Sequence, residues 1–243
     1  MSRYDAYAEE RGEYEPNSLN QVLRNKQGII NPVDAARIET ELLTVAYVDS
    51  FELPISLKFT SAIIRELHRK WLGDFYYMAG EYRTVNVSKG GFMFCPAPNI
   101  LAEMERLERE QLAEHTPCLG SGNIPFGLEF PSEGPDKTAL SKSQPTTVGE
   151  VAYRVSVVHA ELQLIHPFRE GNGRLGRWLA DLMVLQAGYP APEYDLDNDQ
   201  KRNAYYSALR RGFAGDFKPL TSLFEYWIER AQQLDAESQL PSP

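Results

Sequence analysis

The segment from residue 148 to residue 186 constrains the fold most, because a glycine-rich string interrupts two helical patterns. Residues 166–177 read HPFREGNGRLGR, and the apolar residues on both sides of this string recur at helical spacing. The pattern predicts a helix-loop-helix elbow, with the string in the loop and at the start of the second helix. The apolar positions are Val151, Val155, Val158, Leu162 and Ile165 upstream, and Leu175, Trp178, Leu179, Leu182, Met183 and Leu185 downstream.

The residue types in the loop suit an anion of the size of phosphate. Gly171 and Gly173 leave the backbone able to adopt positive φ and to approach a bulky anion, and Asn172 tolerates left-handed conformations and offers amide donors. The second helix is expected to begin at about Arg174, so its unpaired amides and the positive end of its dipole favour negative charge in the loop. Arg174 and Arg177 are three residues apart on one helical face, and guanidinium groups bind phosphoryl oxygens in pairs.

Two further side chains in the string supply reactive chemistry. Glu170 is a hard oxygen ligand, and Mg²⁺ usually takes one or two carboxylates together with substrate phosphates. His166 has an unperturbed pKa of about 6.5 and can accept a proton from a hydroxyl group at neutral pH. Taken singly, a histidine can be a helix cap, Arg177 can pair with Asp181, and the glycines can form an ordinary turn. Their joint occurrence in fixed register favours phosphate chemistry.

The string His-Pro-Phe-x-Glu-Gly-Asn-Gly-Arg-x-x-Arg at residues 166–177 resembles the signature of the Fic family, and every specified position is met. Members are mostly helical proteins that typically move AMP from ATP onto a hydroxyl side chain of another protein. The resemblance therefore implies a mainly α fold, a Fic-type helical bundle with a small β-hairpin flap over the active site. A related group has lysine after an asparagine and transfers phosphate, whereas Gly173-Arg174 in this chain favours nucleotidyl transfer.

The resemblance implies a role for each residue of the motif. His166 would be the base that acts on the target hydroxyl, and Glu170 would hold Mg²⁺. ATP would be the substrate that donates AMP. The remaining residues would serve the phosphates and the core: Gly171, Asn172 and Gly173 as the anion hole, Arg174 and Arg177 at the β- and γ-phosphates, and Phe168 as the anchor of the loop.

Residues 83–94 predict a β-hairpin in an otherwise helical chain. Polar and apolar residues alternate on both sides of a glycine turn, which is typical of two short strands. From these residues alone, an ordinary surface hairpin is an alternative. In Fic proteins a hairpin of this kind, the flap, holds an extended stretch of the target by main-chain pairing. We expect the flap at about residues 83–95, with Ser88, Lys89, Gly90 and Gly91 at its tip.

A pair of tyrosines is the candidate for the adenine pocket. Tyr205 and Tyr206 follow Asn203-Ala204 on a predicted helix, where Fic proteins place aromatic residues near the adenine. Adjacent residues on a helix point in different directions. We therefore expect one of the two tyrosines to line the pocket and the other to pack in the core.

Whole-chain properties exclude several other classes of protein. The 243 residues, 42% of them hydrophobic, suffice for one sizeable core, and no apolar run reaches the length of a membrane span. The first five residues lack the features of a secretory signal, and the two cysteines, Cys95 and Cys118, are too few for a disulfide framework. We therefore expect a cytoplasmic protein that does not bind membranes. The net charge of −9 argues against direct binding of nucleic acid.

The chain is expected to consist of a polar arm at residues 1–27, which wraps the body or stays mobile, a Fic domain at residues 28–235 and a tail at residues 236–243. The proline-, glycine- and serine-rich stretch at 116–147 reads as a long inserted loop, either a surface loop or a target-docking feature. Other helices are expected at residues 32–49, 56–72, 100–114, 199–212 and 218–235, and the helix that begins at about 174 is expected to continue to 189.

A restraining helix is the regulatory device of many Fic proteins. Its pattern is Ser or Thr, three residues, Glu, then Gly or Asn, and its glutamate pairs with the last arginine of the motif. No full match occurs in this chain, because Thr221–Glu225 continues with Tyr226 and Thr146–Glu150 continues with Val151. We therefore expect a separate small antitoxin-like protein that contacts Arg177.

The sequence thus predicts a protein adenylyltransferase that transfers AMP to Tyr, Thr or Ser of a target protein, as a bacterial toxin-like module. By resemblance, candidate targets include subunits of DNA gyrase and topoisomerase IV. The alternative from another class is a scaffold that binds nucleotide without catalysis, which the intact His166 and Glu170 disfavour. Transfer or removal of another phosphate-linked group stays open, because the motif does not specify the donor.

Overall fold

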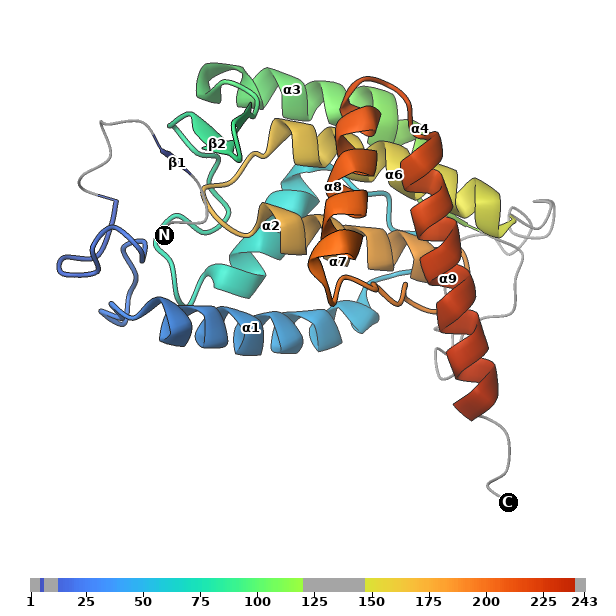
Figure 1. Cartoon of the computed structure of the whole chain (residues 1–243), viewed down its shortest axis with the longest axis horizontal. Coiled ribbons are helices and arrows are strands. Elements are labelled where there is room, and N and C mark those ends of the chain that lie inside the picture. The colour runs from blue at the N-terminus through green and yellow to red at the C-terminus, as the bar shows by residue number, and fades with distance from the viewer. Residues whose placement is uncertain (1–4, 7–12, 120–146, 239–243) are drawn as a thin grey trace. The chain divides into compact units, whose positions relative to one another are not determined.

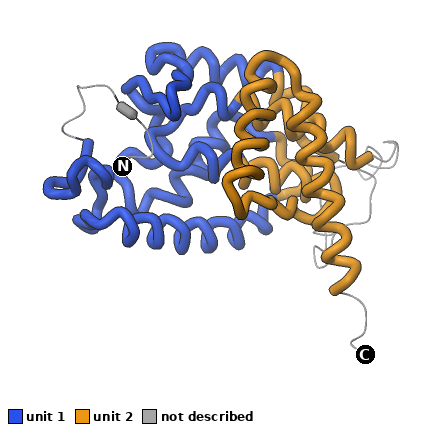
Figure 2. The backbone as a smooth tube through the Cα atoms, viewed as in Figure 1, with its two compact units in different colours: residues 1–53, 59–110, 162–176 blue, residues 54–58, 111–161, 177–243 orange. Residues whose placement is uncertain are grey.

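The computed structural model describes residues 5–6, 13–119 and 147–238, and this part of the chain is predominantly helical with one small sheet (Figure 1). The expected mainly α fold with a β-hairpin is confirmed. The chain forms two compact units (Figure 2). Unit 1 comprises residues 1–53, 59–110 and 162–176, and unit 2 comprises residues 54–58, 111–161 and 177–243.

Local capping explains where the helices of unit 1 begin. Helix α1 (Pro32–Asp49) has the predicted bounds, because the Asn31 side chain accepts a hydrogen bond from Val33 N at 2.8 Å and proline occupies the first helical position. Helix α2 (Ser61–Leu72) was expected from residue 56 and begins five residues later. The Thr60 hydroxyl caps it by accepting from Ile63 N at 3.2 Å. The third helix of the unit is α3 (Ile100–Leu107).

A small antiparallel sheet in unit 1 contains the predicted hairpin. Strands β2 (Val87–Lys89) and β3 (Phe92–Met93) pair directly, and β1 (Asp5–Ala6) pairs with the other edge of β2, which gives the order β1-β2-β3. Gly90 and Gly91 form the turn with φ of 55° and 77°, the left-handed conformation that tight hairpins favour. Of the four predicted tip residues, the two glycines therefore make the turn, and Ser88 and Lys89 end strand β2.

Unit 1 is held together by a core of large aromatic side chains. Trp71, Phe75 and Phe168 have no exposed surface, so the motif loop is anchored in this core through Phe168. The N-terminal segment that the structure describes also packs on the unit. Tyr14 pairs with Leu23, and Asn25 pairs with Tyr76, through isolated β-bridges.

Unit 2 is a helical assembly built around Phe224, Trp227 and Ile228, all nearly or fully buried. Helices α6 (Val148–Ile165) and α8 (Asp199–Phe213) approach closely in it, because a Cβ at Gly212 would lie 3.0 Å from the Ala160 methyl group. Helix α7 begins at Asn172, two residues before the predicted start. The remaining bounds are α4 (Ala113–His115), α7 (Asn172–Gln186) and α9 (Lys218–Ser238), with short helical turns at Ser50–Glu52, Ala97–Asn99 and Glu108–Leu112.

Parts of three predicted regions lie outside the described residues. These are residues 1–4 and 7–12 of the arm, 120–146 of the inserted loop and 239–243 of the tail. Within the described residues, none of the helices combines the length and the apolar character that crossing a membrane requires.

Candidate functional site

The backbone at the end of α6 turns sharply at His166. His166 N donates to Leu162 O at 2.9 Å, and the residue itself has a φ of 52°, in the left-handed region. This conformation costs a non-glycine residue about 1–2 kcal/mol. The Arg83 guanidinium donates through Nε to the His166 carbonyl oxygen at 2.8 Å. A contact from outside the motif therefore compensates for the strain at the candidate base.

The His166 imidazole is a neutral ring with a defined tautomer. Its Nδ1 lies 3.3 Å from Gln163 O, and because a carbonyl only accepts, Nδ1 carries the hydrogen and Nε2 carries the lone pair. The ring stacks on Phe94, with centroids 3.8 Å apart, and is almost completely buried. Burial is the main cause that lowers the pKa of His166 to about 3, and nearby Arg83 and Lys89 contribute to the same shift. A bound polyphosphate would raise the pKa of the ring, because opposite charge favours the imidazolium form.

Asn172 braces the motif loop from within. Its side-chain oxygen accepts from Phe168 N at 2.9 Å, and its side-chain nitrogen donates to Phe168 O at 2.8 Å. Gln163 Nε2 donates to the Asn172 carbonyl at 2.9 Å. The Asn172 side-chain amide, which was expected to serve an anion, is therefore used to shape the loop.

Position 171 requires glycine for two reasons, the backbone conformation of the residue and the lack of space for a side chain. Its φ is 84°, and a Cβ at this position would lie 2.8 Å from the Trp71 ring. Its N–H donates to Glu170 Oε1 at 2.9 Å. Helix α7 starts at the next residue, so the amides of residues 172–174 have no partner within the helix. The amides of residues 172–174 thus lie at the turn, and their role in an anion cradle stays a prediction.

A buried histidine that the sequence analysis missed supports the loop from α2. His68 Nδ1 accepts from Gly80 N at 2.8 Å, so its Nε2 carries the hydrogen and donates to Glu170 O at 3.1 Å. Its ring stacks on Phe168, with centroids 3.9 Å apart. Burial lowers the pKa of His68 to about 4. A histidine in phase with the buried residues of an amphipathic helix was the signal available in the sequence.

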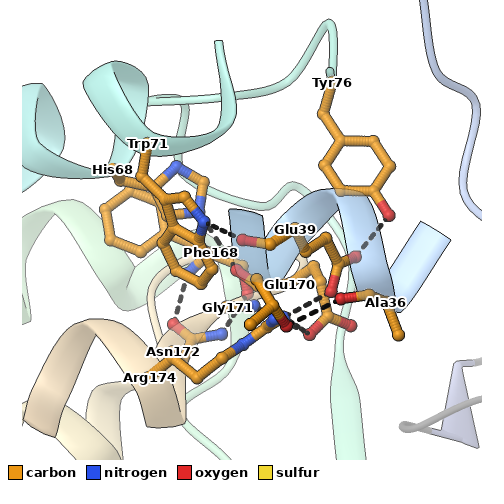
Figure 3. Close-up of polar contacts among 11 residues, drawn as sticks. Ala36, Glu39, His68, Trp71, Tyr76, Phe168, Glu170, Gly171, Asn172 and Arg174 are labelled. Atoms are coloured by element: carbon orange, nitrogen blue, oxygen red, sulfur yellow. Dashed lines mark hydrogen bonds and ion pairs between the residues drawn. The ribbon is translucent and has the colours of Figure 1, made fainter. Parts of the chain in front are cut away.

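The predicted phosphate ligand Arg174 is held by two carboxylates (Figure 3). Its Nη2 lies 2.6 Å from Glu39 Oε2 and 3.4 Å from Glu170 Oε1, and the guanidinium lies over the Trp71 ring at 4.7 Å. Glu39 belongs to α1 and is 3% exposed, and its Oε1 accepts from the Tyr76 hydroxyl at 2.6 Å.

Glu39 was not predicted as a site residue. Ala35 precedes it by four positions and Thr40 follows it, so it does not match the pattern of the restraining helix. The sequence nevertheless indicated that Glu39 is buried, because it lies in helical phase with Ala35 and Ala46, which are the other buried residues of α1. A carboxylate in the buried stripe of a helix requires a partner, which here is Arg174.

A pocket of about 110 Å³ in unit 1 lies beside the two carboxylates. On one side Arg169 donates to Glu13 Oε2 and to the Tyr14 hydroxyl, both at 2.7 Å. Among the described residues there is no cluster of three or more metal-ligating side chains. Glu170 is the carboxylate that could hold Mg²⁺ together with substrate phosphates, and this role stays a prediction. The pocket is lined by Tyr14, Gln21, Val22, Leu23, Pro32, Ala35, Ala36, Glu39, Tyr76, Arg169 and Glu170.

The other predicted nucleotide-binding residues, Arg177, Tyr205 and Tyr206, belong to unit 2. The Arg177 guanidinium lies 6.0 Å from the centroid of the Tyr194 ring. Tyr205 is 4% exposed and its hydroxyl lies 2.7 Å from His159 Nε2, which places it in the core, whereas Tyr206 is 38% exposed. Of the two tyrosines, Tyr206 thus reaches the surface, and its role at the adenine stays a prediction.

Comparisons with known proteins agree with these features. The model of the Fic/DOC family matches residues 58–184, which include the hairpin and the whole motif. Protein adenylyltransferase Fic of Drosophila yakuba is 30% identical over 82% of this chain and 34% of its own length, so the chain spans about a third of that relative. Probable protein adenylyltransferase y4lH of Sinorhizobium fredii is 32% identical over 65% of this chain and 67% of its own length. The structure of Bartonella tribocorum BepC with bound AMPPNP has a TM-score of 0.61 at 21% identity, covering 84% of this chain and 91% of BepC.

The buried neutral histidines predict a loss of stability in mild acid. The pKa values of His68 and His166 lie near 4 and 3 in the folded chain, below the unfolded value of about 6.5, so the unfolded chain binds more protons below pH 6.5. The contribution of the two neutral histidines to the free energy of unfolding is fully present above pH 6.5. As the pH drops toward 4, each histidine lowers the free energy of unfolding by roughly 1.4 kcal/mol per pH unit. Urea unfolding at pH 7, 6 and 5 measures this slope, which should be shallower in His68→Gln. A slope equal in both proteins would contradict the neutral burial of His68.

The contact between Gly171 and Trp71 predicts that Gly171→Ala destabilises the protein. Strain at positive φ and the collision with the indole ring together cost about 2–4 kcal/mol. Gly28→Ala is the matched control, because Gly28 also has a positive φ, of 65°, but a Cβ there would meet no atom within 4 Å. Urea unfolding of both variants separates the collision from the strain. Equal losses in the two variants would show that the contact with Trp71 is unimportant.

Proposed function

The chain belongs to the Fic/DOC family, and from this premise we propose that it is a protein adenylyltransferase that moves AMP from ATP to a hydroxyl side chain of another protein. One observation carries the proposal: unit 1 combines a left-handed glycine turn, a helix N-terminus and Arg174 with a neutral imidazole at His166. The relatives named as adenylyltransferases and the AMPPNP bound to BepC support the choice of ATP.

The proposed reaction assigns each residue one task. Nε2 of His166 accepts the proton of the target hydroxyl as its oxygen attacks the α-phosphorus. The bond from the α-phosphorus to the bridging oxygen breaks, and pyrophosphate leaves. The amides at the start of α7 and the Arg174 guanidinium stabilise the negative charge of the departing phosphates. Mg²⁺, when held by Glu170, would neutralise charge on the phosphate oxygens.

The flap provides the candidate docking surface for the target. Extended peptides can add to the edge of a sheet through main-chain hydrogen bonds. In this structure β1 occupies the β2 edge, so a target strand either pairs with β3 or replaces residues 5–6. The identity of the target, including the gyrase and topoisomerase IV candidates, stays part of the proposal, as does the cytoplasmic location.

Regulation of the activity has two candidate sources. The separate antitoxin that contacts Arg177 remains a hypothesis from family resemblance. The structure favours a restraint within the chain, because Glu39 lies 2.6 Å from the guanidinium that would bind phosphate. Glu39 and Glu170 both lie on Nη2 of Arg174, where their negative charges balance the guanidinium and would repel a triphosphate. Glu39 must therefore release Arg174 before ATP binds productively.

His166→Asn is expected to abolish transfer while the protein stays folded. The asparagine fills part of the space against Phe94 but lacks a basic nitrogen, and loss of a general base costs about 10²- to 10⁴-fold in rate. Wild type and variant are incubated with lysate, Mg²⁺ and α-labelled ATP, and labelled protein bands are compared after circular dichroism has verified folding. Full labelling by the folded variant would remove His166 from the mechanism. Label from γ-labelled ATP instead would indicate phosphate transfer.

Glu39→Gln is expected to strengthen ATP binding about tenfold, which corresponds to roughly 1.4 kcal/mol. The amide keeps the shape of the side chain and its contact with the Tyr76 hydroxyl but removes the charge that competes with phosphate for Arg174. Glu41→Gln is the control, because Glu41 lies on the exposed face of α1 and pairs with Arg37. Calorimetric titration with a non-hydrolysable ATP analogue measures the effect. Unchanged affinity in a folded Glu39→Gln protein would argue against the restraint within the chain.

A further inference from the structure

Arg83 connects both ends of the flap to the backbone of the candidate base. Its Nη1 donates to Val85 O at 2.6 Å, before the hairpin, and its Nη2 donates to Cys95 O, after the hairpin. Its Nε donates to His166 O at 2.8 Å, and its Nη2 also reaches Ile165 O at 3.3 Å. One side chain thus holds three separate segments of unit 1 together.

The chemistry of this position selects arginine. The side chain is buried, at 4% exposure, and burial lowers its pKa to about 10, so it remains a cation at neutral pH. The carbonyls of Ile165 and His166 lie at the C-terminal end of α6, where the helix dipole is negative and a cation is stabilised. A planar guanidinium with five donors can serve four carbonyls in fixed directions, which a lysine ammonium with three donors cannot.

Two further contacts strengthen the link between the flap and His166. The Phe94 ring stacks on the His166 imidazole at 3.8 Å, and Phe94 N donates to Val87 O at 3.2 Å within the hairpin. Cys95 N donates to Leu164 O at 3.3 Å. The flap is therefore attached to the backbone of the base through Arg83 and to its ring through Phe94, so displacement of the flap displaces the imidazole.

We propose that Arg83 is a positioning residue that fixes the flap, and any target strand held by it, relative to Nε2 of His166. The inference rests on the proposed transfer function and adds a determinant outside the motif. The Arg83 side chain contacts the flap and residues 165–166, whereas the triphosphate is expected at residues 170–174. Its loss should therefore slow transfer without weakening ATP binding.

The test uses Arg83→Lys, which keeps the charge, and Arg83→Gln, which removes it. Arg65→Lys is the matched control, because Arg65 donates to Gly80 O at 2.8 Å and pairs with Glu81, which places its contacts outside the flap. Each full-length protein is assayed for affinity to a non-hydrolysable ATP analogue with Mg²⁺, and for the initial rate of AMP incorporation from α-labelled ATP into lysate protein.

We expect both Arg83 variants to bind the analogue with an affinity within about twofold of wild type. AMP incorporation should be about tenfold slower in Arg83→Lys and about 10²-fold slower in Arg83→Gln, because a displacement of about 1 Å at the reacting groups can cause such a loss. The Arg65 control should retain the rate. A wild-type rate in folded Arg83→Gln, or an equal loss of rate and ATP affinity, would overturn the positioning role.

Two measurements keep the proposal testable if a variant or the assay fails. Phe94→Leu breaks the ring stack and leaves the Arg83 contacts, so it should also slow incorporation at unchanged ATP affinity. A wild-type rate would contradict the coupling between the flap and the His166 ring.

If wild type transfers no AMP, the proposed function fails, and ¹⁵N NMR of the histidine rings then tests whether Arg83 positions His166. The His166 resonances should then shift in Arg83→Lys and stay in place in Arg65→Lys, and unshifted resonances would refute the positioning role.

Discussion

Two carbonyl groups of the motif loop, those of His166 and Glu170, are held by buried side chains from outside the motif, and the geometry of the site depends on this. Arg83 binds the carbonyls of Ile165 and His166, and His68 binds that of Glu170. A loop that approaches an anion has to direct its amides toward the ligand, so its carbonyls need partners elsewhere. Because these partners are buried side chains rather than water, the loop keeps its shape before a ligand arrives. Preorganised amides of this kind stabilise charge without reorganisation during the reaction.

The Arg174 guanidinium has one role in the structure and another in the proposed function. In the structure its charge is balanced by Glu39 and Glu170, and in the proposed function it binds a triphosphate. The Glu39 carboxylate is almost completely buried and would be costly without a partner, so its pairing with Arg174 stabilises the fold. Stability and activity therefore place opposite demands on one residue. The Tyr76 hydroxyl and the Trp71 ring, which contact Glu39 and Arg174, fix the geometry of this competition.

Secondary structure followed from the sequence wherever a cap or a period was visible. Asn31 and Pro32 marked the start of α1, and alternation around Gly90-Gly91 marked the hairpin. The predicted starts of α2 and α7 were wrong by a few residues. In α2 the apolar pattern extends upstream of the point where the Thr60 hydroxyl fixes the first turn. In α7 the positive φ of Gly171 ends the loop, so the helix includes Asn172 and Gly173, which propensity alone assigns to a turn.

The sequence by itself determined the chemistry of the site, because the order of His166, Glu170, Gly171 and Arg174 along a short segment fixes which groups a turn and a helix start can present. Periodicity predicted the helices around the motif and the hairpin, and the resemblance to the Fic family implied the mainly helical fold. Only the tertiary structure decided which residues control those groups. Glu39 and Arg174 are 135 positions apart, and Arg83 and His166 are 83 apart. Such pairs leave no period or spacing in the sequence, since they meet only when separate helices and the flap pack into one core.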